Sequence, residues 1–250
     1  MWGAAACAAL TVQSTRGVRA VHAVDTATLS AQVEELLGDL RVTAIKTGAL
    51  GSAANADAVA TLLGAHPAIP GVVDPVMLPS QRVDPGARLD GQGSLSALRR
   101  LSARAFLLTP NLHEAACLLG ETPGSIDDAA AAAQALLDLG AHAVLLKGGH
   151  GTGAESVDWL ALREGPERLV AVAGPRRDTP PLHGTGCTLA SLIAGRLALR
   201  PDARALPSID ALLAAVRWAR ACLDEAIRAP LTVGHGLLVL APAPTRHDPG

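Results

Sequence analysis

Lysine is nearly absent from this 250-residue chain: only Lys46 and Lys147 occur, against 19 arginines. Aromatic residues make up 2% of the chain, tyrosine does not occur, and the formal net charge is −2. A protein that binds nucleic acid along its phosphates needs a basic surface, and stacking on bases needs aromatic side chains. Nucleic acid is therefore not an expected partner.

Other absences exclude further classes of protein. The four cysteines show no C-x-x-C spacing, which argues against a disulfide framework or a zinc site. No apolar run reaches membrane length and the N-terminus lacks a basic signal-peptide region, so we expect a cytoplasmic chain without a membrane partner. No G-x-x-x-x-G-K-[ST] occurs and no G-x-G-x-x-G follows an early strand, which disfavours P-loop kinases and Rossmann dehydrogenases.

The residues that are present indicate one α/β domain spanning 1–250. Hydrophobic residues make up 49%, enough for a large core, and short apolar runs alternate with longer helix-like segments. This alternation is typical of a parallel sheet covered by helices. The predicted strands are 42–47, 71–74, 105–108 and 143–147, with an edge hairpin at 158–163 and 169–172. The predicted helices are 28–37, 53–63, 94–102, 112–119, 127–139, 187–199 and 209–226.

Local signals refine this outline. Ser125 with Asp128 resembles a capping box at the start of the alanine-rich helix, and Gly140 is expected to end that helix. Residues 79–93 are rich in proline and glycine and predict a mobile surface loop, while 242–250 predict a frayed end.

The most informative motif is His-Gly-Thr-Gly-Cys-Thr at 183–188, between a polar loop and an apolar helical run. Two glycines permit a tight turn, and the start of a helix adds unpaired N–H groups and a positive dipole end. Such a turn binds anions, phosphate above all, and its field is expected to favour the thiolate of Cys187. Alternatively, the glycines form only a loop and a helix cap, and Cys187 is a small buried apolar residue.

Polar residues also follow the predicted strands. Lys46 and Lys147 end apolar runs beside glycines, where a lysine can meet a phosphate. Asp74 ends another strand and either holds hydrated Mg²⁺ or caps a turn. Glu114 lies three residues after Asn111, a spacing that fits a capping box or a carboxylate that binds metal-bound water. Four such strand ends together favour phosphoryl transfer.

In their order along the chain, these motifs resemble the hydroxymethylpyrimidine/phosphomethylpyrimidine kinase family of thiamine biosynthesis, in the ribokinase-like superfamily. The resemblance covers nearly the whole chain from Gly3 to about Gly236. The matching segments are ALTVQSTRG at 9–17, KTGAL at 46–50, DPVM at 74–77, TPNLHEA at 109–115, KGGH at 147–150 and HGTGCT at 183–188. Sugar kinases of the superfamily usually have aspartate where this chain has Cys187. The resemblance implies a three-layer sandwich with a mostly parallel sheet between helices.

The implied reaction is ATP-dependent phosphorylation of 4-amino-5-hydroxymethyl-2-methylpyrimidine and/or its monophosphate, to the diphosphate. Cys187 would take the proton of the hydroxymethyl group or help to position its phosphate. The backbone N–H groups of Gly184, Thr185, Gly186 and Cys187 would form an anion hole for the transferring phosphoryl group. Lys147 would meet the phosphates of ATP. These roles agree with the chemistry, since phosphoryl transfer depends mainly on positioning and charge neutralisation.

The resemblance also implies substrate and metal contacts. Gln13 would hydrogen-bond the aminopyrimidine, and Ala49 and Met77 would line its pocket. Glu114 with Asp74 would organise Mg²⁺, through water. Family members are commonly homodimers, so the same is expected here.

Departures from the family leave alternatives open. About thirty residues of the family's N-terminal strand–helix unit, with its first strand, are expected to be missing, through an upstream start or a truncation. Ala49 replaces a methionine common in the family, so a pyridoxal or pyridoxine kinase is one alternative. The other is a truncated nucleotide-binding pseudoenzyme without turnover.

Overall fold

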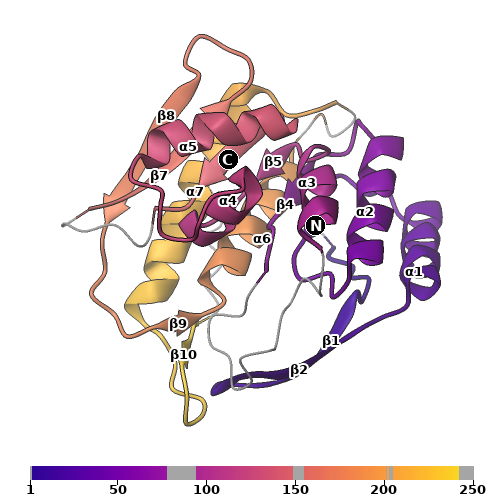
Figure 1. The fold of residues 1–250 in the computed structure, drawn as a ribbon, viewed down its shortest axis with the longest axis horizontal. Coiled ribbons are helices and arrows are strands. Elements are labelled where there is room, and N and C mark those ends of the chain that lie inside the picture. Colours follow the sequence, from indigo (N-terminus) through magenta and orange to yellow (C-terminus); the bar gives the residue numbers. More distant parts are fainter. Residues whose placement is uncertain (1, 78–93, 149–154, 201, 203–204, 242–250) are drawn as a thin grey trace.

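A six-stranded sheet in the order β3-β4-β5-β6-β7-β8 forms the centre of the computed structural model (Figure 1). The structure describes residues 2–77, 94–148, 155–200, 202 and 205–241, so the predicted loop at 79–93 and the predicted frayed end at 242–250 lie outside the described residues. The first four strands are parallel, and β7 and β8 continue the sheet as an antiparallel hairpin. The strands are β3 (Ile45–Thr47), β4 (Gly71–Val73), β5 (Leu107–Leu108), β6 (Ala143–Leu146), β7 (Glu155–Leu162) and β8 (Leu169–Pro175).

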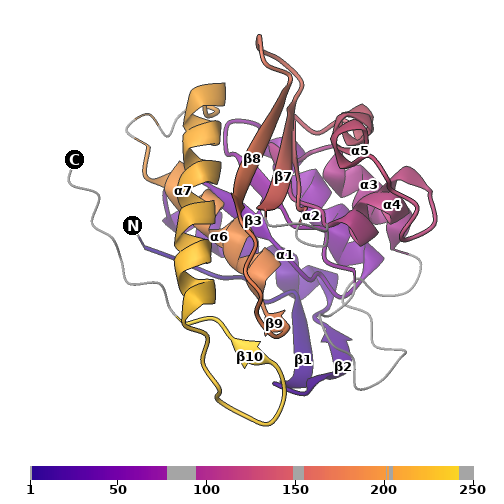
Figure 2. The ribbon, with the colours of Figure 1, turned by 90° about the vertical axis from the view of Figure 1, so that its left-hand side faces the viewer.

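Helices cover both faces of this sheet and make it the middle of three layers (Figures 1 and 2). One apolar core forms between the sheet and the helices from α1 to α5, and a second forms between the sheet and the pair α6 and α7. Strands β4, β5 and β6 are buried throughout, as expected for parallel strands covered on both faces. The helices are α1 (Thr26–Asp39), α2 (Ala53–Ala65), α3 (Leu95–Ser102), α4 (Leu112–Leu119), α5 (Ala129–Ala135), α6 (Thr185–Ala198) and α7 (Ile209–Arg228), with a 3₁₀ turn at Leu136–Leu139.

Two small sheets lie beyond one end of the central sheet (Figure 2). Strands β1 (Ala9–Ser14) and β2 (Gly17–Ala23) form an antiparallel hairpin, and β9 (Leu182–His183) pairs in parallel with β10 (Leu238–Val239). The hairpin tip joins the C-terminal segment, because the Leu237 N–H donates to the Thr15 carbonyl at 2.7 Å. Segments more than 200 residues apart in sequence therefore meet at this end of the molecule.

Every predicted strand and helix overlaps an observed one, but two local details differ. The predicted helix 127–139 is α5 followed by the 3₁₀ turn, which ends at Gly140 with φ of 118°. The predicted Ser125–Asp128 capping box is wrong. Asp128 is itself the N-cap and accepts from the N–H groups of Ala130 and Ala131, whereas the Ser125 hydroxyl donates to Glu121.

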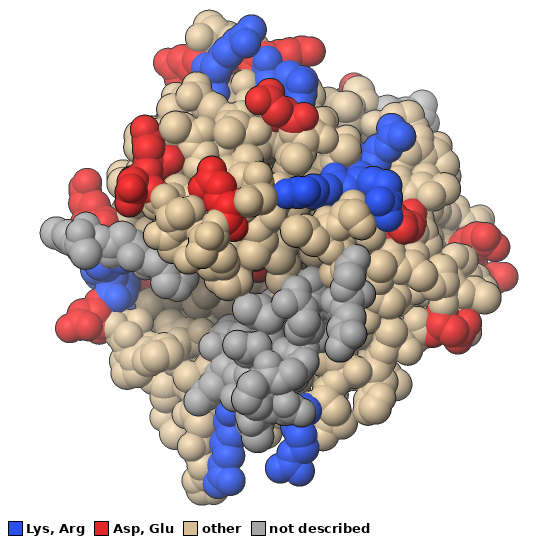
Figure 3. All heavy atoms as spheres, in the orientation of Figure 1, with Lys and Arg blue, Asp and Glu red and all other residues tan. Residues whose placement is uncertain are grey.

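The surface agrees with the low net charge. On the face shown in Figure 3, Lys and Arg side chains are interspersed with Asp and Glu. Among the described residues, none of the helices combines the length and the apolar character that crossing a membrane requires.

Candidate active site

A cavity of about 1380 Å³ opens where the parallel strands end, between the β1–β2 hairpin and the start of α6. Open α/β sheets bind ligands at this edge, beyond the carboxyl ends of their strands. Most of the predicted site residues line it: Gln13, Ala49, Asp74, Glu114, Lys147, Gly184, Thr185, Gly186 and Cys187. The folded chain thus brings together residues spread from position 13 to position 187.

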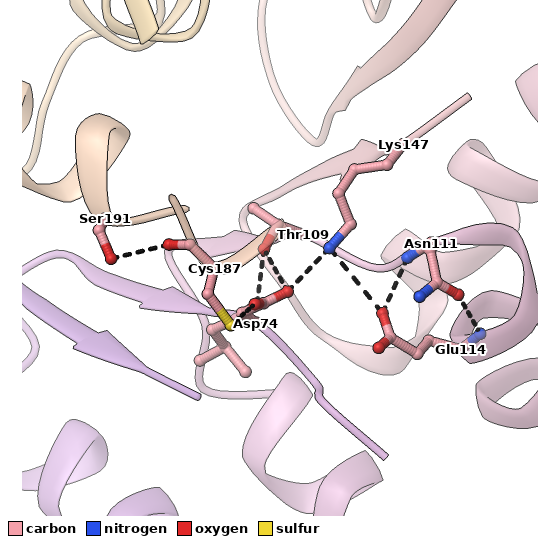
Figure 4. A network of polar contacts seen from close by, with 8 residues as sticks. Asp74, Thr109, Asn111, Glu114, Lys147, Cys187 and Ser191 are labelled. Carbon is pink, nitrogen blue, oxygen red and sulfur yellow. Dashed lines mark hydrogen bonds and ion pairs between the residues drawn. The ribbon is translucent and has the colours of Figure 1, made fainter. Parts of the chain in front are cut away.

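Asp74 is the centre of a polar network on the cavity wall (Figure 4). The carboxylate follows β4 and is only 2% exposed. Its Oδ1 accepts from the Lys147 ammonium at 2.8 Å, and its Oδ2 accepts from the Cys187 thiol at 3.3 Å. The Thr109 hydroxyl approaches Oδ1 at 3.4 Å. Three strand ends and the start of α6 therefore converge on a single buried carboxylate.

Glu114 forms a capping box and also lies at the polar network, so the two interpretations of this residue, a helix cap and a site carboxylate, are compatible. The capping box is present: its Oε2 accepts from the Asn111 N–H, and the Asn111 side chain accepts from the Glu114 N–H, both at 2.9 Å. The same Oε2 lies 3.9 Å from the Lys147 ammonium. The cap at the start of α4 consequently also fixes a carboxylate beside Lys147 and Asp74.

The electrostatics of this group follow from burial. Burial raises the pKa of Glu114 to about 7, although the Lys147 charge opposes the shift. Burial also lowers the pKa of Lys147, but the attraction of Asp74 and Glu114 outweighs it, so that pKa lies above its ordinary value. Near neutral pH the site therefore holds a charged lysine beside one carboxyl group that titrates.

The raised pKa predicts that stability falls as the pH rises from about 4.5 to about 7. Over this range the Glu114 carboxyl has lost its proton in the unfolded chain, where its pKa is ordinary, but keeps it in the folded protein. The folded state then binds more protons, so the free energy of unfolding decreases with pH. Glu114→Gln should remove this slope, because the glutamine amide does not titrate. The variant should still fold, because glutamine also completes a capping box. Urea unfolding of the unsubstituted protein and of Glu114→Gln, at about pH 5 and about pH 8, measures how the free energy of unfolding changes with pH. An equal change in the two proteins would contradict the raised pKa of Glu114.

Helix α6 begins as the glycine motif predicts, at Thr185, two residues before the predicted start. Gly184 caps it with φ of 84°, and the first intrahelical bond runs from the Thr188 N–H to the Gly184 carbonyl. Helix geometry leaves the N–H groups of Thr185, Gly186 and Cys187 without intrahelical acceptors. A Cβ on Gly186 would lie 3.1 Å from the Lys147 ammonium nitrogen, so this glycine lets the lysine approach the helix start.

The expected thiolate of Cys187 is wrong, because the thiol pKa is raised rather than lowered. Burial raises the pKa of the Cys187 thiol to about 11, and the Asp74 charge raises it further, while Lys46 and Lys147 oppose the shift. The thiol is therefore neutral and donates a hydrogen bond to Asp74. Burial and a neighbouring carboxylate therefore decide the pKa of Cys187, against the effect expected from the helix dipole.

Of the three predicted substrate contacts, Gln13 and Ala49 line the cavity and Met77 does not. Gln13 Nε2 lies 2.8 Å from His183 Nε2, so this contact joins the β1–β2 hairpin to the segment before α6. Met77 is placed differently from the other predicted contacts: it is 2% exposed, belongs to the apolar core and is not among the described residues that line the cavity. Its backbone, rather than its side chain, contributes to the site, through a hydrogen bond with Glu114.

The carboxylates fit a hydrated magnesium ion better than a fully protein-bound metal. Among the described residues no group of three or more His, Cys, Asp and Glu side chains could hold a metal ion. Asp74 and Glu114 do face the same cation, Lys147, from the end of β4 and from the first turn of α4. Mg²⁺ typically keeps several waters and uses one or two carboxylates together with substrate phosphates, which matches this donor set.

A helix start that faces a lysine and two carboxylates, at the carboxyl edge of a sheet between two helical layers, is the arrangement expected of a phosphotransferase site. The comparisons with known proteins agree. A family model described as phosphomethylpyrimidine kinase matches residues 1–241. The chain belongs to this family of kinases.

Individual relatives give the extent of the similarity. The hydroxymethylpyrimidine/phosphomethylpyrimidine kinase of Salmonella typhimurium is 37% identical over 238 residues, which cover 94% of this chain and 84% of that protein. The thiamine biosynthesis bifunctional protein ThiED of Geobacter sulfurreducens is 39% identical over the same share of this chain and 45% of its own length. The matched region therefore corresponds to most of the Salmonella typhimurium kinase and to less than half of the bifunctional protein.

Solved structures confirm the ribokinase-like fold. The phosphomethylpyrimidine kinase from Clostridium difficile 630 superposes with a TM-score of 0.69 at 29% identity, over 90% of this chain and 87% of that one. The pyridoxal kinase from Staphylococcus aureus in complex with AMP-PCP superposes with a TM-score of 0.75 at 26% identity, over 94% and 80%.

Proposed function

We propose that this chain uses ATP to phosphorylate 4-amino-5-hydroxymethyl-2-methylpyrimidine and/or its monophosphate, as a step of thiamine biosynthesis. The observation that carries the proposal is the contact series from Lys147 through Asp74 to Cys187 at the start of α6. It places a cation, a proton acceptor and free backbone N–H groups around one point of the cavity. ADP release with each pyrimidine tests the proposal.

The proposed chemistry depends on position and charge. The N–H groups at the start of α6 and the Lys147 ammonium would stabilise the negative charge of the transferring phosphoryl group. Cys187 would accept the proton of the substrate hydroxyl at Sγ while its own proton passes to Asp74 Oδ2, 3.3 Å away. This transfer needs no thiolate in the resting protein, which fits a thiol pKa of about 11.

Magnesium is part of the proposal. Asp74 and Glu114 would hold the ion through water. When bound, it would neutralise charge on the phosphates of ATP. The pKa of Glu114, about 7, makes one of the two carboxylates fully available only above neutral pH.

A pyridoxal or pyridoxine kinase is the second candidate, favoured by the small side chain of Ala49 on the cavity wall and by the likeness to a pyridoxal kinase structure. Ala49→Met should reduce the space beside the ring. Because pyridoxine carries more ring substituents than the pyrimidine, we expect the substitution to lower kcat/KM for pyridoxine about tenfold more than kcat/KM for hydroxymethylpyrimidine. Initial rates with both alcohols measure the ratio, and an unchanged ratio would show that position 49 does not select the substrate.

The proposal also includes the setting of the protein: one kinase domain over 1–250, acting in the cytoplasm as a homodimer, with small-molecule partners rather than nucleic acid or membrane.

A further inference from the structure

Asp158 is a buried carboxylate that the proposed chemistry does not use. It lies on β7 and is 4% exposed. We propose that Asp158 is a positioning residue for Lys147 and that Arg220 on α7 holds Asp158 in place. This inference rests on the proposed role of Lys147 at the nucleotide phosphates.

The first link joins Asp158 to the turn after β6. Asp158 Oδ1 accepts from the Gly148 N–H at 2.8 Å, and Gly148 directly follows Lys147. A Cβ on Gly148 would overlap the carbonyl oxygen of Val157, so the turn packs against the backbone of β7. The Lys147 N–H is itself fixed to the Pro110 carbonyl at 2.9 Å. The backbone around the lysine is thus held from two neighbouring strands.

The second link joins Asp158 to α7. The Arg220 guanidinium donates to Asp158 Oδ2 and to the Ser156 carbonyl. It crosses β8 at Gly174, where a Cβ would lie 3.0 Å from the Arg220 Nε. Both Asp158 oxygens are therefore occupied, as a buried carboxylate requires. Asp158 does not pair with Lys147 directly: its charge is balanced by Arg220, which leaves the ammonium to Asp74 and Glu114.

These links make the position of the ammonium depend on α7. Lys147 Nζ lies 2.8 Å from Asp74 and close to Gly186, so a small shift of the turn changes both contacts. A displacement of about 1 Å in a phosphate-binding group is enough for a large loss of rate. Asp158 and Arg220 also line the cavity, and the inference is that they act on the nucleotide through Lys147 rather than by direct contact.

Calorimetric titration with AMP-PCP and initial rates test this in the full chain. Asp158→Asn and Arg220→Gln should each raise the Kd for AMP-PCP by about tenfold, the effect of losing one charged hydrogen bond. The KM of the alcohol should stay constant. The double variant Asp158→Asn with Arg220→Gln should bind AMP-PCP no more weakly than either single variant. In a Lys147→Gln background, Asp158→Asn should not change the Kd for AMP-PCP. Arg100→Gln breaks an exposed ion pair with Asp57, outside the cavity, and should leave the Kd unchanged.

Unchanged AMP-PCP affinity in Asp158→Asn would overturn the inference. So would an effect that persists in the Lys147→Gln background, because Asp158 would then act on the nucleotide by another route. If Asp158→Asn does not fold, the comparison moves to Arg220: Arg220→Lys keeps the charge and should recover most of the affinity lost in Arg220→Gln, and equal losses would overturn the inference. AMP-PCP binding requires no turnover, so normal binding without ADP release in the unsubstituted protein would contradict the proposed function alone.

Discussion

Cys187→Ala is expected to lower kcat by about 10²- to 10⁴-fold, the range that a positioned proton acceptor contributes. The variant removes the only side chain that links the start of α6 to Asp74 in the described network. It should still fold, since the thiol contributes one hydrogen bond to a site that Lys147 and Thr109 also hold together. Steady-state rates and the thermal midpoint of both proteins measure the two effects.

Two variants make this prediction specific. Cys187→Ser keeps a hydroxyl that can donate to Asp74, so it should retain more turnover than the alanine variant. Cys7→Ala changes an exposed cysteine outside the cavity and should behave as the unsubstituted protein. A kcat for Cys187→Ala within about threefold of the unsubstituted protein would remove Cys187 from the proposed proton transfer.

Lys147→Gln is expected to lower kcat/KM for ATP by about 10²- to 10³-fold, the loss typical for one group that stabilises developing charge. Glutamine retains N–H donors for Asp74 but has no charge for the phosphates. Lys147→Arg should not restore activity. The ammonium nitrogen already lies 3.1 Å from the point where a Cβ on Gly186 would be, and a guanidinium is larger.

Initial rates at varied ATP and AMP-PCP titration together test the role of Lys147. Loss of nucleotide affinity with an unchanged KM for the alcohol is the expected pattern. If Lys147→Arg proves as active as the unsubstituted protein, charge alone matters at this position and the close fit against Gly186 does not.

Hydrophobic patterns predicted the central sheet and its helices, but not the small sheets at the cavity mouth. The buried strands β4 and β6 are apolar runs that a pattern detects readily. Strand β1 is largely exposed, and β9 and β10 have two residues each. Their pairing depends on contacts between distant segments, such as Leu237 with Thr15, which no local pattern contains.

The grouping of the candidate site residues was predictable, and their electrostatics less so. Glycines and polar residues at strand ends predicted that Asp74, Glu114, Lys147 and the start of α6 lie together, and they line one cavity. The raised pKa of Cys187 was not predictable, because it depends first on burial and then on a carboxylate 113 positions away in sequence. Thr109 and His183 were not assigned roles, although both lie within the motifs that were recognised.

The most direct test of the account is a coupled ADP-release assay on this chain with hydroxymethylpyrimidine, its monophosphate and pyridoxine. We predict turnover on at least one of the two pyrimidines, with a higher kcat/KM than on pyridoxine. A folded sample that binds AMP-PCP but releases no ADP with any of the three compounds would contradict the kinase function and favour a nucleotide-binding pseudoenzyme.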